Sequence, residues 1–357
     1  MPGGPFPEAP GTLVGAVLAR DLAVAGERWP KGRRLSAGDL ALLAGGAVRG
    51  RGPWTDARPD APAFPVTLLV PGADDVHEDD AAGRLAAAVA GPGLAVRGPA
   101  ESRIDLVAAH PGVVRVRADL LERLDAIDGL AVFSVLDGQP VVEGALVASV
   151  KTGPHLVPEA SVARAEALAL RHRPVVEVRP YIRRRVTAVV KETLGPAARE
   201  RFEAALGAKV ESLGSEIVDI VYAADDADTV TAVLRSLTRG RNRVDLVLTA
   251  GAASTDPGDA IFAGLTAIGG RITSHGVPAH PGSMLWLGRV GRTAILGLPT
   301  CGAYSKATAA DLLLPWLLAG EPPSRRTVAR LGHGGILTRD MRFRFPPYAR
   351  DLDAPGG

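Results

Sequence analysis

Cysteine, aromatic residues and excess charge are all scarce in this chain, and each shortage narrows what it can do. The single cysteine is Cys301, so one chain forms neither a disulfide framework nor a metal site of several thiolates. Aromatic residues make up 4% of the sequence, which argues against a base-stacking surface for nucleic acid. A net charge of +2 gives no general attraction to a polyanion. We therefore expect no nucleic-acid partner.

Long apolar runs are missing as well. No segment reaches the roughly 18 consecutive apolar residues that a membrane helix requires, so no membrane partner is expected. The first ten residues contain four prolines and no apolar core, which is not the pattern of a secretory signal peptide. These features predict a cytoplasmic protein.

What is present is an ordinary globular composition over 357 residues, enough for two or three domains. An Arg- and Pro-rich segment at 171–185 has the composition of an interdomain linker. We expect an N-terminal accessory α+β region at 1–175 and an α/β domain at 176–321. Residues 322–357 are expected to form a C-terminal tail, for which the sequence indicates no chemistry.

The second domain alternates strands and helices. Apolar runs at 186–190, 217–222 and 244–249 predict strands, and the segments 197–206 and 229–237 predict the helices between them, the first ended by Gly207. Strands separated by helices of about ten residues form βαβ units with parallel strands. The sequence therefore predicts a three-layer, doubly wound, mostly parallel α/β sheet.

The stretch from Val244 to Gly320 organises this domain. It contains three loops, Ala250–Asp259, Pro278–Met284 and Gly297–Ser305, each of which follows or leads into a predicted strand. Open α/β sheets hold their ligands outside the carboxyl ends of the strands. We expect the three loops to converge on that edge and to line one ligand site.

An acidic run at 74–80 contains His77 among five carboxylates and has two interpretations. It could be a metal site, or it could begin the helix predicted at 81–90, where carboxylates complement the helix dipole. The helix start is favoured, because the side chains are crowded and no distant partner cluster is evident.

The loop motifs resemble a known family. Ser254–Asp259 follows a Thr-Ala-Gly sequence, Pro281-Gly282 and Gly297-Leu298-Pro299 lie downstream, and Asp225-Asp226 follows the second strand. In this order the motifs resemble the molybdopterin-binding domain. That domain is shared by molybdopterin adenylyltransferases (MogA-like) and by molybdenum-insertion enzymes (MoeA-like). The insertion branch is the more similar, and the chain looks like a divergent member.

The resemblance implies which residues contact the ligand. Small residues let the backbone approach ligand oxygens, and hydroxyl groups donate hydrogen bonds. The ligand would be molybdopterin or adenylyl-molybdopterin, a pterin and nucleotide substrate, with molybdate as a further small-molecule partner. The expected ligand-binding residues are Gly251, Ala252, Ser254, Thr255, Pro281, Gly282, Ser283, Pro299, Thr300 and Ser305.

Asp256 and Asp259 are the expected catalytic pair, with Asp256 as the Mg²⁺ ligand. Two carboxylates beside a phosphate repel it unless a divalent cation bridges them or they accept hydrogen bonds from the pterin. In a structural alternative, Asp259 caps the helix that begins at Ala260, and Asp256 belongs to a turn at Pro257. The sequence leaves both interpretations open.

Departures from the family pattern leave two functions in view. Ala252 replaces the second glycine of the main loop, Ser283-Met284 replaces Lys-Pro, and Thr300-Cys301 follows Gly-Leu-Pro where Gly-Asn-Pro is usual. The first function is Mg²⁺-dependent transfer of molybdate to adenylyl-molybdopterin, a transferase reaction. The second is a non-catalytic molybdopterin or nucleotide binder that acts as a carrier or sensor. The resemblance also implies a homodimer.

Overall fold

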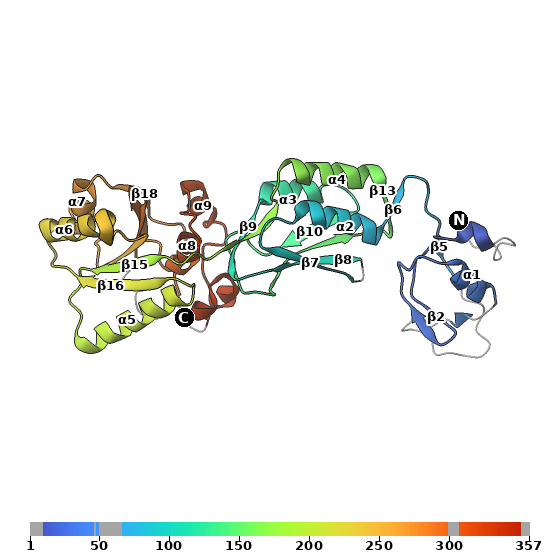
Figure 1. The fold of residues 1–357 in the computed structure, drawn as a ribbon, viewed down its shortest axis with the longest axis horizontal. Helices are drawn as coiled ribbons and strands as arrows, with labels where there is room; N and C mark the ends of the chain where they lie inside the picture. The colour runs from blue at the N-terminus through green and yellow to red at the C-terminus, as the bar shows by residue number, and fades with distance from the viewer. Residues whose placement is uncertain (1–9, 46–47, 50–65, 101, 299–306, 351–357) are drawn as a thin grey trace. The chain divides into compact units, whose positions relative to one another are not determined.

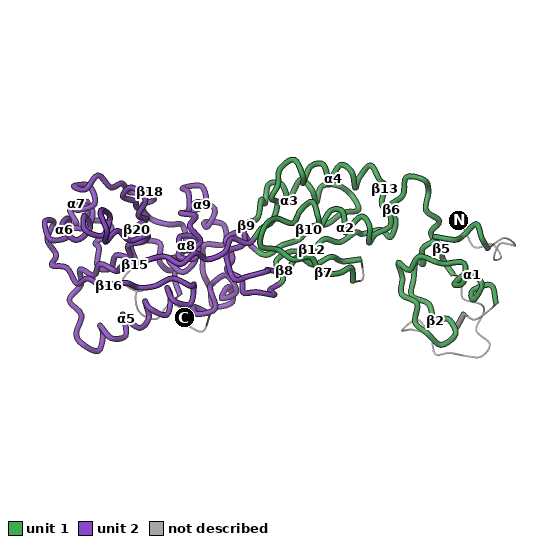
Figure 2. The backbone as a smooth tube through the Cα atoms, viewed as in Figure 1, with its two compact units in different colours: residues 1–107, 116–135, 146–177 green, residues 108–115, 136–145, 178–357 purple. Residues whose placement is uncertain are grey.

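The chain packs into two units, each described here by itself (Figure 2). The computed structural model describes residues 10–45, 48–49, 66–100, 102–298 and 307–350. Unit 1 comprises residues 1–107, 116–135 and 146–177, and unit 2 comprises residues 108–115, 136–145 and 178–357. Within the described ranges, no helix is long and apolar enough to cross a lipid bilayer.

Unit 1 has the expected α+β character, with several small antiparallel sheets. The largest has the strand order β10-β12-β8-β7. The helices are a 3₁₀ turn (Pro10–Leu13), α1 (Ala37–Ala44), α2 (Glu78–Val89), α3 (Ala118–Asp125) and α4 (Glu159–Arg171). The strands are β1 (Val17–Leu18), β2 (Leu22–Val24), β3 (Glu27–Trp29), β4 (Val48–Arg49), β5 (Leu68–Leu69), β6 (Asp75–His77), β7 (Leu94–Ala100), β8 (Arg103–Ala108), β10 (Leu130–Ser134), β12 (Leu146–Thr152) and β13 (Leu156–Pro158).

The acidic run begins helix α2. Glu78, Asp79 and Asp80 occupy its first turn, and the His77 ring accepts a hydrogen bond from the Asp79 N–H. Among the described residues, no group of three or more His, Cys, Asp and Glu side chains could hold a metal ion. The helix-start interpretation of this run is confirmed.

The centre of unit 2 is a six-stranded sheet with the order β16-β15-β17-β20-β19-β18. Strands β16, β15, β17 and β20 run parallel to one another, whereas β19 and β18 are antiparallel to their neighbours. β17 lies inside the sheet between β15 and β20, which confirms it as a central parallel strand. The strands are β15 (Arg185–Val190), β16 (Glu216–Tyr222), β17 (Leu246–Ala250), β18 (Arg271–His275), β19 (Trp286–Val290) and β20 (Thr293–Gly297).

Helices cover both faces of this sheet (Figure 1). α5 (Pro196–Glu211) and α8 (Ala309–Leu318) pack on one face, and α6 (Ala227–Thr238) and α7 (Ala260–Ala267) on the other. In β15, Val186 and Ala188 belong to the first core and Val189 to the second. A strand that is buried on both faces has a nearly continuous run of apolar residues, and this run is the feature that predicted β15. The three-layer, mostly parallel fold is confirmed.

Helix α5 passes through Gly207, where the sequence analysis ended it, and continues to Glu211. Glycine in a helix interior costs only about 1 kcal/mol. Val210, which lies beyond it, shares the buried core with Phe202 and Leu206 at helical spacing. Tertiary packing therefore outweighs the local preference of glycine to end a helix.

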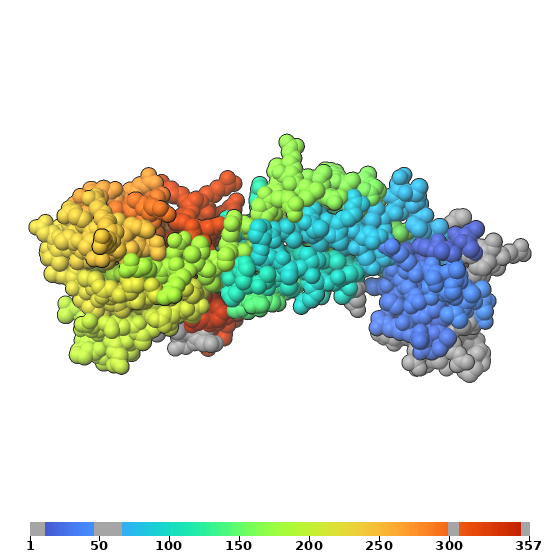
Figure 3. All heavy atoms as spheres, in the orientation of Figure 1, coloured from blue at the N-terminus to red at the C-terminus, as the bar shows by residue number. Residues whose placement is uncertain are grey.

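The described part of the expected C-terminal tail, residues 322–350, packs into unit 2. They form α9 (Arg325–Arg330), a 3₁₀ turn (Arg339–Arg344) and α10 (Pro347–Arg350). Their apolar side chains join the core beside α5 and α8, and Figure 3 shows this segment, in red, against the rest of the unit. This packing is not evident from the sequence, because the side chains involved are isolated and follow no helical or strand period. They are Val328, Leu337, Phe345 and Ala349.

Two segments of the expected accessory region also belong to unit 2. They carry β9 (Gly112–Val116) and β11 (Pro140–Val141), which form a three-stranded sheet with β14 (Val176–Pro180). The turn at Gly138 faces α8, where a Cβ atom would lie 2.7 Å from Cζ2 of Trp316. The Arg115 guanidinium stacks 4.3 Å over the same ring and pairs with Asp137 at 3.3 Å.

Two glycine substitutions test this packing in opposite directions. A Cβ at Gly297, the last residue of β20, would lie 2.0 Å from Nε1 of the buried Trp286, so Gly297→Ala should lower the free energy of unfolding by about 1–3 kcal/mol. A Cβ at Gly207 would have the Glu211 carboxylate as its nearest neighbour, at 3.8 Å. Gly207→Ala should therefore raise the free energy of unfolding by roughly 0.5–1 kcal/mol. Urea denaturation measures both. A neutral Gly297→Ala variant would contradict the packing of Trp286 on β20.

Candidate functional site

The carboxyl ends of β15, β17 and β20 form one edge of the sheet in unit 2. Lys191 N–H donates to the Ala250 carbonyl at 3.0 Å, and Leu298 N–H donates to the Thr249 carbonyl at 2.8 Å. The start of β19 pairs with the end of β20 through Trp286 and Gly297, which brings the Pro281–Ser283 turn to this edge. Pro299, Thr300 and Ser305 lie outside the described residues. Two of the three predicted loops therefore share the expected edge.

Gly251 fixes the path of the loop that follows β17. Its φ angle is +87°, a region that residues with a Cβ atom rarely adopt. A Cβ there would lie 2.6 Å from Cγ and 3.0 Å from the backbone nitrogen of Glu192. The loop thus packs directly on the segment that follows β15. Ala252 packs against the core of α6 and α7. The Ser254 carbonyl accepts a 2.5 Å hydrogen bond from the His275 ring. Thr255 is exposed.

Asp259 is the N-cap of α7, as the structural alternative predicted. Its Oδ1 accepts a hydrogen bond from the Ile261 N–H at 2.9 Å. Its Oδ2 accepts one from the Ala253 N–H at 2.7 Å, which ties the start of the loop to its end. The carboxylate is buried, so these donors replace the water that it would otherwise bind.

Lys191 supplies the charge that balances this buried carboxylate. Its Nζ lies 2.6 Å from Asp259 Oδ2 and 2.7 Å from Asp225 Oδ1, and its side chain is only 5% exposed. Burial opposes the charged ammonium, but the hydrogen bonds to the two carboxylates raise the pKa of Lys191 overall. The pKa of Asp259 is lowered: burial raises it, but Lys191 and the backbone N–H donors outweigh that effect. One cation thus joins the ends of β15 and β16 to the start of α7.

The strand period explains the position of Lys191, which the sequence analysis missed. Side chains on a strand alternate between its two faces. Val189 belongs to the core beneath α6 and α7, so Lys191, two residues on, points to the same side just past the strand end. There it pairs with Asp225, which directly precedes the α6 cap Asp226, and with Asp259, the cap of α7. A lysine at the carboxyl end of an apolar strand was the available signal.

The Asp256 side chain forms no ion pair with this cluster in the described structure. It is exposed, and its Oδ1 accepts a 2.8 Å hydrogen bond from the Gly258 N–H, which closes a turn around Pro257. This geometry matches the turn interpretation. The two carboxylates therefore differ in surroundings, and the assignment of Asp256 to Mg²⁺ stays a prediction.

The Pro281–Ser283 turn contacts the beginning of α8. Pro281 accepts a hydrogen bond at its carbonyl from the Ala309 N–H at 2.9 Å, and Ser283 accepts one from the Val277 N–H at 2.8 Å. Gly282 has φ +98°, and a Cβ there would lie 2.9 Å from both Ala309 N and Thr308 Cβ. A third helix start, capped by Thr308, thus lies beside this turn.

Two buried polar atoms near this edge have no hydrogen-bond partner in the described part of the chain. They are Oγ1 of Thr249 and Nε1 of Trp286. Both flank Gly297, because Thr249 is its register partner and the Trp286 indole covers its Cα. Unpaired buried polar groups are uncommon, and a ligand at the site is one explanation for them.

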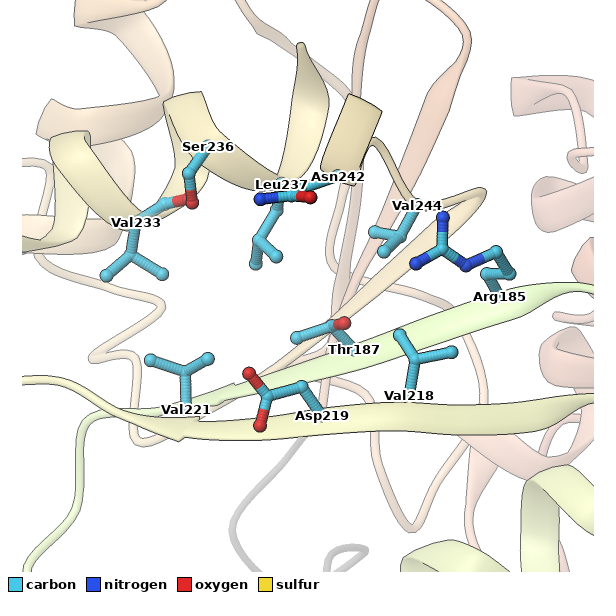
Figure 4. A pocket seen from close by; sticks show the side chains of 10 residues that line it. All are labelled: Arg185, Thr187, Val218, Asp219, Val221, Val233, Ser236, Leu237, Asn242 and Val244. Atoms are coloured by element: carbon cyan, nitrogen blue, oxygen red, sulfur yellow. The ribbon is translucent and has the colours of Figure 1, made fainter. Parts of the chain in front are cut away.

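A cavity of about 280 Å³ lies at the opposite end of the strands (Figure 4). Thr187 and Asp219 contribute to it from the sheet, Val233 and Leu237 from α6, and Arg185 from the first residue of β15. None of the residues that the sequence analysis selected lines it. It is therefore separate from the carboxyl-edge site.

The ion cluster predicts different effects for the two aspartates. Asp259→Asn keeps the helix cap but removes the charge opposite Lys191, so it should lower the free energy of unfolding by about 1–3 kcal/mol at pH 7. Asp256→Asn should change it by less than about 0.5 kcal/mol, as exposed substitutions do. Because the folded pKa of Asp259 lies below 3.8, its stabilisation is present above that pH and is lost as pH falls further. The difference between parent and Asp259→Asn should shrink below about pH 4.

Chemical denaturation from pH 7 down to about pH 3 measures both variants. Equal stability of parent and Asp259→Asn at pH 7 would contradict the buried pairing with Lys191. A large loss in Asp256→Asn would show that the turn at Pro257 carries the loop instead.

Comparisons with known proteins agree with the motifs. Residues 186–319 match the family described as "Probable molybdopterin binding domain". No curated protein matches the chain. Among solved structures, the molybdopterin biosynthesis MoeA protein from Pyrococcus horikosii is 16% identical, with a TM-score of 0.29 over 72% of this chain and 81% of that one. A NadC deletion mutant is 13% identical, with a TM-score of 0.16 over 45% and 69% of the two chains. Neither structural likeness bears on function, because both TM-scores lie below 0.5.

The matched residues begin in β15 and end just after α8. They include Lys191, Asp225, the Gly251–Asp259 loop and the Pro281 turn, and thus nearly every described residue of the carboxyl-edge site. The order of the motifs, the mostly parallel sheet and the family match all agree. Residues 186–319 of this chain therefore match the molybdopterin-binding domain family that the motifs resemble.

Proposed function

We propose that the protein binds molybdopterin at the carboxyl edge of the sheet in unit 2 and serves as a binding protein in molybdenum cofactor assembly. The observation that carries this proposal is the ion cluster beside the Gly251 loop, in which the buried Lys191 pairs with the buried Asp259 and with the exposed Asp225. The starts of α6 and α7 also lie at this edge, and helix N-termini favour an anionic ligand because they carry partial positive charge.

The chemistry of molybdopterin matches what this edge offers. Its phosphate is an anion, and its pterin ring has several hydrogen-bond donors and acceptors. The unpaired Thr249 hydroxyl and Trp286 indole N–H provide buried polar contacts near Gly297. Ser254 and Thr255 add hydroxyl groups on the loop, and Gly251 lets its backbone lie close to Glu192.

The alternative is catalysis: transfer of molybdate to adenylyl-molybdopterin, with release of AMP. The retention of Asp256 and Asp259 favours it. The replacements in the Pro-Gly loop and after Gly-Leu-Pro favour binding without turnover. The homodimer that the resemblance implies stays a prediction.

Mass spectrometry of the small molecules that co-purify with the protein tests the proposal. We expect a pterin with a dithiolene and a phosphate, and saturable binding when the stripped protein is titrated with molybdopterin in the absence of oxygen. Absence of both would refute the proposal. Production of AMP from adenylyl-molybdopterin and molybdate would establish the catalytic alternative instead.

Gly251→Ala tests where the ligand binds. The substitution strains a residue at φ +87° and pushes the loop off Glu192, so the affinity for molybdopterin should fall at least about tenfold. Gly207→Ala, in the interior of α5, is the matched control and should bind as the parent does. Titration of the three proteins at equal folded fraction gives the comparison. Parent-like affinity in Gly251→Ala would place the ligand elsewhere.

A further inference from the structure

We infer that the ammonium of Lys191 stands in place of a divalent cation at the carboxyl edge, so that this site binds its ligand without Mg²⁺. This inference rests on the proposed function for the identity of the ligand. The cation itself is assigned from the geometry of Lys191, Asp225 and Asp259 alone.

The buried carboxylate has little capacity left for a metal ion. Oδ1 of Asp259 accepts the Ile261 N–H, and Oδ2 accepts both the Ala253 N–H and the Lys191 ammonium. Mg²⁺ requires oxygen ligands at about 2.0–2.1 Å in near-octahedral geometry. To bind here, the ion would have to displace the lysine and detach the loop from its cap. The donor set of Asp259 therefore does not fit Mg²⁺.

Charge disfavours the metal for a second reason. Nζ of Lys191 lies within 2.7 Å of a carboxylate oxygen on each side, and the side chains of Lys191 and Asp259 are only 5% and 1% exposed. A divalent ion placed beside a buried ammonium is repelled more strongly than in water, because the local dielectric constant is low. The two carboxylates need no metal ion, because Lys191 already supplies a compensating positive charge.

Asp256 does not complete a metal site with this cluster. It is exposed, and one of its oxygens accepts the Gly258 N–H at 2.8 Å. Within the described ranges, no group of three or more His, Cys, Asp and Glu side chains is arranged to hold a metal. The two aspartates that the motif places together therefore do not form a two-carboxylate site.

Lys191 retains the means to contact a ligand. An ammonium group has three N–H donors, and two of them are used by Asp225 and Asp259. No described residue takes the third. Lysine binds phosphate as a compact point charge. The same side chain thus holds the loop and offers a donor to an anionic ligand.

The metal arm of the test uses Mn²⁺ alone, followed by electron paramagnetic resonance and calorimetry on the full chain. The parent should show no Mn²⁺ site at about 1 mM, and its melting temperature should be the same in EDTA and in MgCl₂. Lys191→Met leaves two carboxylates facing each other without a cation. It should bind Mn²⁺ at least about tenfold more tightly than the parent and melt at a higher temperature when the metal is present.

Lys209→Met is the matched control. Lys209 is the other buried lysine of unit 2 that pairs with an aspartate, with Nζ 2.5 Å from Asp311 and side chains 6% and 1% exposed. It faces one carboxylate instead of two, so its loss should destabilise the protein without creating a Mn²⁺ site. Equal rescue of both variants by Mn²⁺ would overturn the inference.

Folding of the variant does not limit the test. If Lys191→Met folds only when Mn²⁺ is supplied, the inference is supported. If it folds under neither condition, Mn²⁺ binding to the parent protein gives the answer. A Mn²⁺ site in the parent that Asp256→Asn or Asp259→Asn abolishes would overturn the inference. A parent without such a site would support it.

The ligand arm separates this inference from the proposed function. Molybdopterin binding that is equally tight with and without EDTA supports both. Binding that is lost in EDTA overturns the metal-free site and leaves the proposed function standing. No binding under either condition refutes the proposed function, and the Mn²⁺ measurements still decide the role of Lys191.

Discussion

The ammonium of Lys191 lies between two carboxylates, and the carboxyl edge of unit 2 depends on this contact. Asp259 is buried and cannot keep its charge without a compensating cation and hydrogen-bond donors. Lys191 supplies the cation, and the N–H groups of Ala253 and Ile261 supply the donors. The ion pair thus fixes the Gly251–Asp259 loop, the first turn of α7 and the end of β15 with respect to one another.

The two-faced sheet brings these charges together. Because β15 is covered on both sides, its side chains alternate between two buried cores, and Lys191 is delivered past the strand end to the face where α6 and α7 begin. On the other face, Asp311 in the first turn of α8 pairs with Lys209 and accepts a hydrogen bond from Tyr348 at 3.0 Å. Burial, followed by the nearby Asp311 charge, raises the pKa of Tyr348. The segment after residue 321 thereby helps to hold the start of a helix that faces the Pro281 turn.

The departures from the family pattern and the geometry of the site point in the same direction. The loop has a glycine at positive φ and ends at a capped helix start, beside a lysine that pairs with two carboxylates. Asp259 is engaged with a lysine and two backbone donors, so it is a structural anchor of the loop. Asp256 faces solvent, and within the described ranges it belongs to no group of three or more His, Cys, Asp and Glu side chains that could hold a metal.

The sequence by itself determined the layer order, the parallel strands and the loop motifs, because these follow from apolar periodicity and from residues adjacent in the chain. It offered the cap at Asp259 as one of two interpretations, and the structure decided between them. It did not determine the pairing of Lys191 with Asp225 and Asp259, which are 34 and 68 positions away. The sequence also predicted that α5 ends at Gly207, because glycine often ends a helix. It assigned residues 322–357 to a tail, because a few isolated apolar side chains show no helical or strand period. Only the tertiary structure decided these points, because a buried charge finds its partner through the packing of the sheet and helices and not through local sequence.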